Sequence, residues 1–147
     1  MILRVLSRLL FISEGCFLLI KYKKSYEKIA MGLLSFIPSE KDLKKLMNTI
    51  NEYDMENDRM LYLWKENEGI VGLIGILFKN NQIHLQHLAI NPSHRNQGFG
   101  KHLVKALKRH YPSTPILPTE NTEAFLHKCN IIEDLQRDMK KLMPALN

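Results

Sequence analysis

The sequence contains little cysteine, glycine or proline, which are abundant in several classes of protein. Its 147 residues include two cysteines, seven glycines and six prolines. Cys16 and Cys129 are far apart and show no CxxC spacing, which excludes a disulfide-rich secreted scaffold and favours a reduced cytosolic protein over one with a single structural disulfide. The low glycine and proline contents exclude collagen-like and low-complexity disordered chains. This length suffices to bury a core, so we expect one globular domain.

Long uninterrupted hydrophobic runs are also absent. Residues 1–20 are rich in leucine, isoleucine and phenylalanine, but two arginines and a glutamate interrupt them, whereas a membrane-spanning helix needs about 20 apolar residues. No small-residue cleavage site follows, so the segment does not fit a secretory signal. Glu14-Gly15 is what a ribosome-binding GAAGGA encodes when it is translated. We therefore expect residues 1–17 to be an N-terminal extension outside the native product, with Leu18 as the start and a peripheral amphipathic helix as the alternative.

Acidic residues are outnumbered by basic ones, 15 against 21, which leaves a net charge of +6. Such an excess suggests an anionic partner, either nucleic acid, acidic lipid or a phosphorylated small molecule. Residues 1–24 hold five of the basic residues and one acidic residue, so most of the excess lies near the N-terminus. No nucleic-acid-binding motif accompanies it. We expect neither nucleic acid nor a membrane as a partner.

The spacing of apolar residues predicts an alternation of strands and helices. Strands are predicted over 17–22, 60–65, 70–78, 82–90 and 114–118, and helices over 25–36, 39–53, 98–111, 120–128 and 132–146. Short turns between the three middle strands are typical of an antiparallel meander. Over residues 17–128 the order β-α-α-β-β-β-α-β-α predicts an α/β fold (an α+β mixed sheet) with helices on both faces.

Ser39 and Asp42 predict how the second helix begins. They stand three residues apart and resemble a capping box, in which the hydroxyl and the carboxylate satisfy the first free amides of a helix. The apolar residues that follow have helical spacing. We expect this helix to bury Leu43, Leu46, Met47 and Ile50.

The segment from Leu88 to Gly100 contains the pattern that predicts an anion-binding site. It places a buried strand, a polar loop and two glycines before a helix. Glycines let the backbone approach a ligand closely, and the free amides of a helix N-terminus attract an anion such as pyrophosphate. A dinucleotide-binding GxGxxG does not fit, because Leu103 stands where the third glycine belongs, and a Walker loop does not fit, because His102 follows Lys101.

Arg95-Asn96-Gln97-Gly98-Phe99-Gly100 resembles the Arg/Gln-x-x-Gly-x-Gly/Ala signature of the GNAT N-acetyltransferases, and Leu88-x-Ile90-x-Pro92 resembles the strand and loop that precede it. This resemblance implies the acyl-CoA N-acyltransferase (GNAT) fold, with two splayed parallel strands over 82–90 and 114–118. It also implies acetyl-CoA as co-substrate and an amine of a small molecule or protein as acceptor. A non-catalytic acyl-CoA-binding or regulatory protein of the same fold is the alternative.

The resemblance also assigns cofactor-binding residues. The backbone of Leu88 and Ile90 is expected to pair with the pantetheine arm, and the amide of Leu88 or Ala89 to stabilise the oxyanion. Asn121 is expected to meet the same arm. The pyrophosphate and the neighbouring phosphate are expected to contact Arg95, Asn96, Gln97, Gly98, Phe99, Gly100 and Lys101. A side chain at either glycine is expected to collide with the phosphates.

The candidate catalytic bases are histidines. His84 stands where some members of the family carry a glutamate base, and His87 and Gln86 are the other candidates. Histidine titrates near neutrality and can act through a bridging water, although a purely structural histidine is an equal alternative. A separation of three residues directs His84 and His87 to opposite faces of a regular strand. We therefore expect no shared metal site.

The C-terminal part departs from the family pattern. Leu126 stands at the position of the tyrosine that protonates the departing thiolate, so water or His127 would have to replace it, and Asn130 stands at a glycine. Residues 131–147 are predicted to be a C-terminal helical segment beyond an acetyltransferase domain over 18–130. If this segment packs on its own domain, we expect a monomer, and if it forms a dimer interface, we expect a homodimer.

A closer resemblance lies in residues 19–36, 38–45 and 91–95. These segments are similar to the RibT family of small acetyltransferase-like proteins of the bacillar riboflavin operon, over about residues 18–129. The resemblance supports the expected start at Leu18. It implies a cytoplasmic setting and a link to riboflavin biosynthesis, but it does not supply a substrate.

Overall fold

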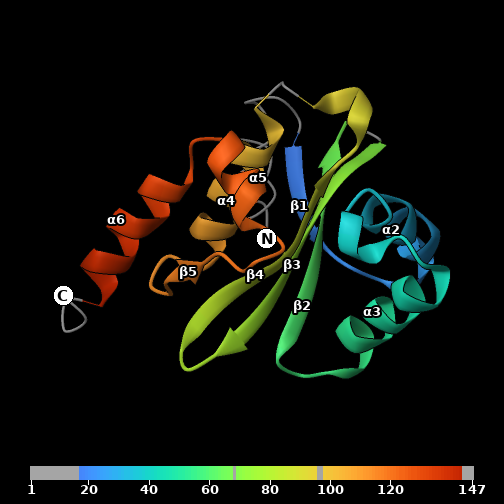
Figure 1. The fold of residues 1–147 in the computed structure, drawn as a ribbon, viewed down its shortest axis with the longest axis horizontal. Helices are drawn as coiled ribbons and strands as arrows, with labels where there is room; N and C mark the ends of the chain where they lie inside the picture. The colour runs from blue at the N-terminus through green and yellow to red at the C-terminus, as the bar shows by residue number, and fades with distance from the viewer. Residues whose placement is uncertain (1–16, 68, 96–97, 144–147) are drawn as a thin grey trace, which may run out of the picture.

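The computed structural model describes residues 17–67, 69–95 and 98–143 (Figure 1). The expected N-terminal extension lies outside the described residues apart from Phe17, so its expected absence from the native product stays a prediction. The strands are β1 (Phe17–Lys21), β2 (Arg59–Glu66), β3 (Gly69–Lys79), β4 (Gln82–Ile90) and β5 (Ile116–Leu117). The α-helices are α2 (Glu27–Leu34), α3 (Leu43–Met55), α4 (Phe99–His110), α5 (Glu123–Lys128) and α6 (Ile132–Leu142), and short 3-10 helices are η1 (Lys24–Tyr26), η2 (Pro38–Glu40) and η3 (Pro92–His94).

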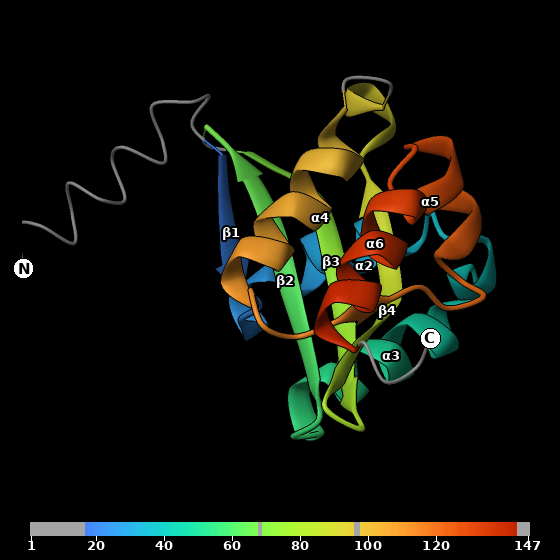
Figure 2. The ribbon, with the colours of Figure 1, turned by 90° about the vertical axis from the view of Figure 1, so that its left-hand side faces the viewer.

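The five strands form one sheet in the order β1-β2-β3-β4-β5. The first three pairings are antiparallel and the last, between β4 and β5, is parallel. Helices α4, α5 and α6 cover one face of the sheet, and α2 and α3 cover the other (Figures 1 and 2). This confirms the mixed sheet with helices on both faces.

Each face of the sheet has its own hydrophobic core. Leu103, Val104 and Leu107 recur at helical spacing on α4 and pack with one set of inward strand residues. Ile132 and Leu135 of α6 belong to the same core, so the C-terminal helix packs on the domain. The second core lies under α2 and α3. None of the helices in the described part of the chain is long and apolar enough to cross a membrane.

The predicted capping box of the second helix is wrong. Ser39 lies in η2, where Pro38 begins a 3-10 turn, and α3 starts only at Leu43. Asp42 is the N-cap residue, but its side chain makes no capping hydrogen bond. Because proline favours the first position of a helical turn, the chain completes one short helix before it starts the next.

The predicted buried face of α3 is partly wrong. Leu46 and Ile50 are buried as predicted, whereas Leu43 and Met47 are 63% and 51% exposed. The buried face continues from Ile50 to Tyr53, which the apolar pattern did not single out. The helix is therefore rotated so that Leu43 and Met47 form an exposed apolar stripe.

Candidate active site

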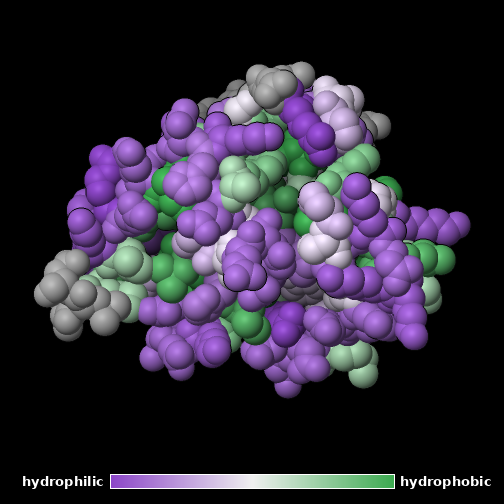
Figure 3. Space-filling model, viewed as in Figure 1, coloured by the Kyte–Doolittle hydropathy of each residue, from purple (hydrophilic) through white to green (hydrophobic). Residues whose placement is uncertain are grey.

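The parallel strands β4 and β5 are paired over a very short distance. Only Ile83 with Ile116 and His84 with Leu117 are partners. At the next residue of β4, the carbonyl oxygen of Leu85 accepts hydrogen bonds from two threonine hydroxyls that follow β5, at 2.6 and 3.0 Å (Thr119 and Thr122). The strands therefore separate after His84. On the face seen in Figure 3, hydrophobic surface is visible between α5 and α2.

A β-bulge lies where β4 leaves β5. The register with β3 pairs Ile76 with Leu85 and Gly75 with His87, so Gln86 has no partner. Such a bulge bends a strand and changes the side to which its residues point. The bulge lies at the apex of the opening between β4 and β5.

The bulge overturns the prediction that His84 and His87 point to opposite faces. Their partners in β3 are Leu77 and Gly75, which stand two residues apart and share one face. The extra residue, Gln86, turns an odd spacing into a shared face. In the residues that the structure describes, no group of three or more histidine, cysteine or acidic side chains is placed to hold a metal ion.

The backbone of Leu88 and Ile90 faces the opening. The amide of Asn91 donates to the carbonyl oxygen of Val71 in β3 at 2.7 Å. Backbone groups alternate in direction along an antiparallel pair, so those of Leu88 and Ile90 point away from β3, and those of Ala89 point toward it. All three side chains are buried.

The N-terminus of α4 lies beyond η3. Gly98 is its N-cap residue, with φ of +75°, a left-handed conformation that favours glycine. A Cβ there would meet no atom within 4 Å, so the space beside Gly98 is open. Asn96 and Gln97 lie outside the described residues.

Gly100 also has a structural reason that the sequence did not indicate. It is buried, and a Cβ at this position would lie 2.5 Å from the Phe125 ring and 3.0 Å from Sγ of Cys129, both from α5 or its end. The expected collision with phosphate is therefore not needed to explain this glycine. Its absent side chain lets α4 pack closely against α5. Phe99, its neighbour, is buried in the core.

The remaining predicted cofactor residues lie at the surface. The guanidinium carbon of Arg95 is 5.7 Å from the centre of the ring of Phe36, which lies in the turn after α2, and the two form a cation–π contact. Lys101 is half-buried in the first turn of α4. Asn121 is exposed in the loop that leads into α5. The cation–π contact brings Arg95 to the end of α2.

His87 is the centre of a buried polar network. Its Nδ1 lies 2.5 Å from the hydroxyl of Tyr53, and its Nε2 lies 3.0 Å from Oε1 of Glu40. The hydroxyl of Thr49 donates to the other oxygen of Glu40 at 2.9 Å. The contacts are satisfied when Tyr53 donates to Nδ1 and the protonated Nε2 donates to Glu40. Both ring nitrogens of His87 are thus engaged.

Burial controls the protonation of this network. It lowers the pKa of His87 below the ordinary value, although the hydrogen bond and charge of Glu40 act in the opposite direction. Burial also raises the pKa of the Tyr53 hydroxyl. No sequence pattern singled out Glu40, Thr49 or Tyr53 as a site residue. Thr49 and Tyr53 could have been found from their helical spacing, because they share the buried face of α3 with Leu46 and Ile50.

His84 has a different environment from His87. It is half-buried, and it is the last residue of β4 that pairs with β5. Its Nε2 is buried and has no hydrogen-bond partner within the described residues. Of the two histidines, His84 has the nitrogen that is not already engaged.

Leu126 is fully buried in the core beside α4 and has no ionisable group. His127, the other residue considered as an acid, is exposed and lies 3.9 Å from Glu123. Asn130, at the position of the family's glycine, has φ of +55°. Asparagine is one of the few residues that adopt this conformation readily, so the chain turns after α5 as a glycine would allow.

The chain matches the profile of the Acetyltransferase (GNAT) family over residues 16–125. It belongs to this family. An uncharacterized N-acetyltransferase from the lysA 3' region of Bacillus methanolicus is 57% identical over 115 residues, which cover 78% of this chain and 96% of that protein. The family match and the opening beside β4 agree with acetyl-CoA as co-substrate and an amine as acceptor.

Solved structures agree with the fold. The aminoglycoside N-acetyltransferase AAC(6')-Iy in complex with CoA gives a TM-score of 0.64 at 13% identity, over 82% of this chain and 87% of that chain. A possible acetyltransferase from Clostridium difficile 630 gives 0.66 at 11% identity, over 82% and 89%. At these identities the likeness establishes the GNAT fold alone.

Proposed function

We propose that this acetyltransferase binds acetyl-CoA in the opening between β4 and β5. The observation that carries the proposal is the direction of the Leu88 and Ile90 backbone groups, which face this opening and no paired strand. An extended pantetheine arm contains amide groups, and these can hydrogen-bond to the strand as a further strand would. Asn121, in the loop before α5, is a candidate contact for the arm.

The phosphates of the cofactor are assigned to the N-terminus of α4. The free amides there attract an anion, with about 0.3–1 kcal/mol for each exposed charge contact. Gly98 leaves open space beside them. Several contacts must act together to hold a pyrophosphate. The proposed set is Arg95, Asn96, Gln97, Gly98, Phe99, Gly100 and Lys101.

The proposed reaction is direct transfer. The amine nitrogen forms a bond to the acetyl carbon, the carbon–sulfur bond breaks, and the sulfur leaves as the thiolate of CoA. The Leu88 amide faces the opening and is the proposed oxyanion donor, whereas the Ala89 amide is directed at β3. Holding both reactants in place contributes most, since effective molarities of about 10⁵ M or more are available from orientation.

We propose His84 as the base that takes the proton of the amine, directly or through water. It lies at the apex of the opening, whereas His87 is buried and bonded through both nitrogens. His87 is therefore assigned a positioning role, in which Glu40 and Tyr53 hold β4 next to Leu88.

Titration calorimetry of acetyl-CoA into the full chain tests the cofactor site. Arg95→Ala is expected to weaken binding about tenfold, and Arg137→Ala, on the exposed face of α6, is the matched control. Release of CoA thiol in the presence of amines then tests transfer. Binding without thiol release from any amine would favour the acyl-CoA-binding alternative, and no binding by folded protein would overturn the site.

Substitution of each histidine tests the base. His84→Gln is expected to reduce kcat while the dissociation constant of acetyl-CoA stays unchanged, and to change the shape of the pH–rate profile. His87→Gln is expected to lower stability and to leave the shape of that profile intact. The opposite pattern would transfer the role to His87.

The narrower assignments of this proposal rest on similarity. Residues 19–36, 38–45 and 91–95 resemble the RibT family, and we propose on this basis a link to riboflavin biosynthesis and a cytoplasmic setting. We also propose an acetyltransferase domain over 18–130 followed by a helical segment, in a monomer or homodimer, which sedimentation analysis tests.

A further inference from the structure

Phe36 presents an exposed aromatic ring from the turn that follows α2. The residue is 42% exposed, whereas Leu34 before it and Ile37 after it are buried. Hydrogen bonds hold the turn. The amide of Phe36 donates to the carbonyl oxygen of Leu33 at 3.2 Å, and the amide of Ile37 donates to the carbonyl oxygen two positions before Phe36 at 2.9 Å. Buried neighbours and hydrogen bonds therefore fix the backbone from which the ring projects.

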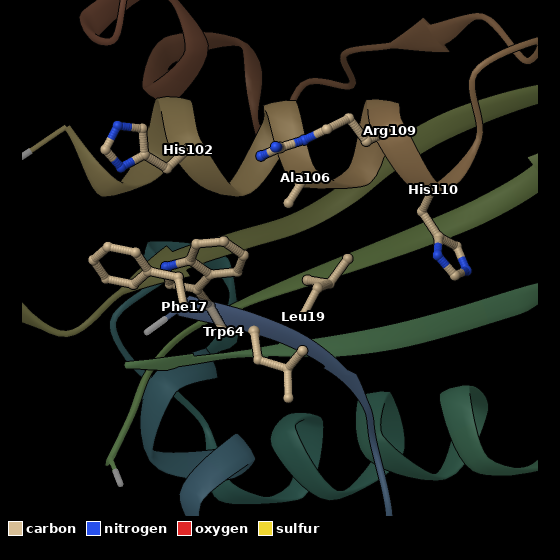
Figure 4. Close-up of a pocket in the computed structure, with 8 residues that line it drawn as sticks. Phe17, Leu19, Trp64, His102, Ala106, Arg109 and His110 are labelled. Atoms are coloured by element: carbon tan, nitrogen blue, oxygen red, sulfur yellow. The ribbon is translucent and has the colours of Figure 1, made fainter. Parts of the chain in front are cut away.

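The partner of the Phe36 ring is a charged group. Elsewhere in the protein, aromatic rings lie against each other: Phe17 and Trp64 are stacked in a cavity at the β1 edge of the sheet (Figure 4), and Phe78 packs against another ring. Phe36 instead lies against the guanidinium of Arg95, whose central carbon is 5.7 Å from the ring centre. Arg95 belongs to the loop assigned to the phosphates of acetyl-CoA.

The same turn also contacts β4. It continues into η2, where the buried Glu40 places its Oε1 3.0 Å from Nε2 of His87. Arg95 follows η3, in the loop that leaves β4. The segment from Phe36 to Glu40 thus contacts both the strand assigned to the pantetheine arm and the loop assigned to the phosphates. This double contact places the ring relative to the proposed cofactor site.

The Phe36 ring holds Arg95 without neutralising it. No carboxylate within the part of the chain that the structure describes forms an ion pair with Arg95. A carboxylate would cancel the charge and occupy the N–H donors, whereas the face of a ring attracts the cation and leaves its charge in place. A long side chain that is held in advance also loses less conformational freedom when an anion binds.

We propose that Phe36 is a positioning residue, which holds the guanidinium of Arg95 toward the phosphates of acetyl-CoA. The inference rests on the proposed cofactor site and adds to it a residue from outside the glycine motif. Phe36 acts through Arg95 and not by touching the cofactor. Its removal should therefore lower the affinity for acetyl-CoA only while Arg95 is present.

Calorimetric titration of acetyl-CoA into variants of the full chain tests this role. Phe36→Leu keeps an apolar side chain but removes the ring, and it is expected to weaken binding about three- to fivefold, the size of an exposed cation–π contact. Phe36→Tyr keeps the face of the ring and is expected to bind as the parent does. Phe78→Leu, which removes a ring that packs against Tyr111, is the control and should leave the affinity unchanged.

A double-variant cycle separates positioning of Arg95 from support of the turn. In an Arg95→Ala background, Phe36→Leu is expected to cause no further loss of affinity, because the group that it positions is gone. An equal loss in both backgrounds would overturn the inference, since Phe36 would then act on the site without Arg95. Tighter binding by Phe36→Leu would also overturn it, since the ring would then withhold Arg95 from the phosphates.

The experiment distinguishes failure of this role from failure of the cofactor site. Saturable binding by the parent with the same affinity in Phe36→Leu would overturn the role of Phe36 and leave the cofactor site intact. A parent chain that is folded but does not bind acetyl-CoA would overturn the cofactor site, and the role of Phe36 with it.

Discussion

The hydroxyl of Tyr53 in α3 lies 2.5 Å from Nδ1 of His87 in β4, and the ring of Tyr53 crosses Gly75 of β3 on the way. A Cβ at Gly75 would overlap the Tyr53 hydroxyl and lie 2.5 Å from its Cζ. Because Gly75 of β3 has no side chain, Tyr53 of α3 can reach His87 in the neighbouring strand β4. The hydrogen-bond network around His87 depends on this contact.

Gly75→Ala is expected to destabilise the protein by about 1–3 kcal/mol, the usual cost of an overpacked core. Urea unfolding measures the change. Gly32→Ala in α2, where a Cβ meets nothing within 4 Å, is the control and is expected to stabilise by about 0.5–1 kcal/mol. The cost should fall when Tyr53→Leu is added, since the clashing ring is then gone. Equal costs in both backgrounds would show that Tyr53 is not the obstacle.

Stability is expected to depend on pH through His87. Because burial lowers the pKa of folded His87, the unfolded chain takes up the proton first as the pH falls below about 6.5. The free energy of unfolding should therefore decrease as the pH is lowered below that value. Above it, His87 should cause no pH dependence of the free energy of unfolding. Urea unfolding between pH 5 and 8 measures this slope. His87→Gln should flatten it, whereas the exposed His127→Gln should not.

The two glycines at the start of α4 are expected to respond differently to alanine. Gly100→Ala should cost about 1–3 kcal/mol of stability, because its Cβ meets Phe125 and Cys129. Gly98→Ala should cost about 1 kcal/mol, from its positive φ alone, while weakening acetyl-CoA binding. Thermal unfolding and calorimetry on both variants make the comparison. A Gly100→Ala protein as stable as the parent would contradict the packing argument.

Thr122→Val is expected to destabilise the protein by about 1–3 kcal/mol. The buried hydroxyl of Thr122 donates to the Leu85 carbonyl at 3.0 Å and accepts from the Thr119 amide at 3.0 Å, so valine leaves both groups without this partner. Urea unfolding measures the loss. Thr114→Val, a half-buried threonine in the loop before β5, should change stability by less than about 0.5 kcal/mol. Similar values for the two variants would contradict the role of Thr122.

The order of elements and the motif of α4 could be predicted from the sequence, because apolar spacing and glycine position are local signals. Gly98, Leu88 and Ile90 lie where the motif indicated. The faces of His84 and His87 could not be predicted, since they depend on a bulge that only the register with β3 reveals. A rule of alternation fails wherever one residue is inserted.

The network of Glu40, Thr49 and Tyr53 was missed for a similar reason. Its hydrogen-bonded pairs are 9, 34 and 47 residues apart in the chain, and no short motif records such contacts. The packing of Gly100 against Phe125 also joins two helices that the sequence describes separately. Local pattern therefore predicted which elements exist, and long-range contacts decided what several of their residues do.

Trp64 is the chain's only tryptophan, and it is stacked on Phe17 in the outermost strand. Since β1 pairs with β2 alone, it is an edge strand that can detach from the sheet in local opening. Detachment would bring the indole into contact with water and shift its emission to longer wavelengths. The protein thus carries its own optical probe of one strand, which separates fraying of that edge from unfolding of the whole sheet.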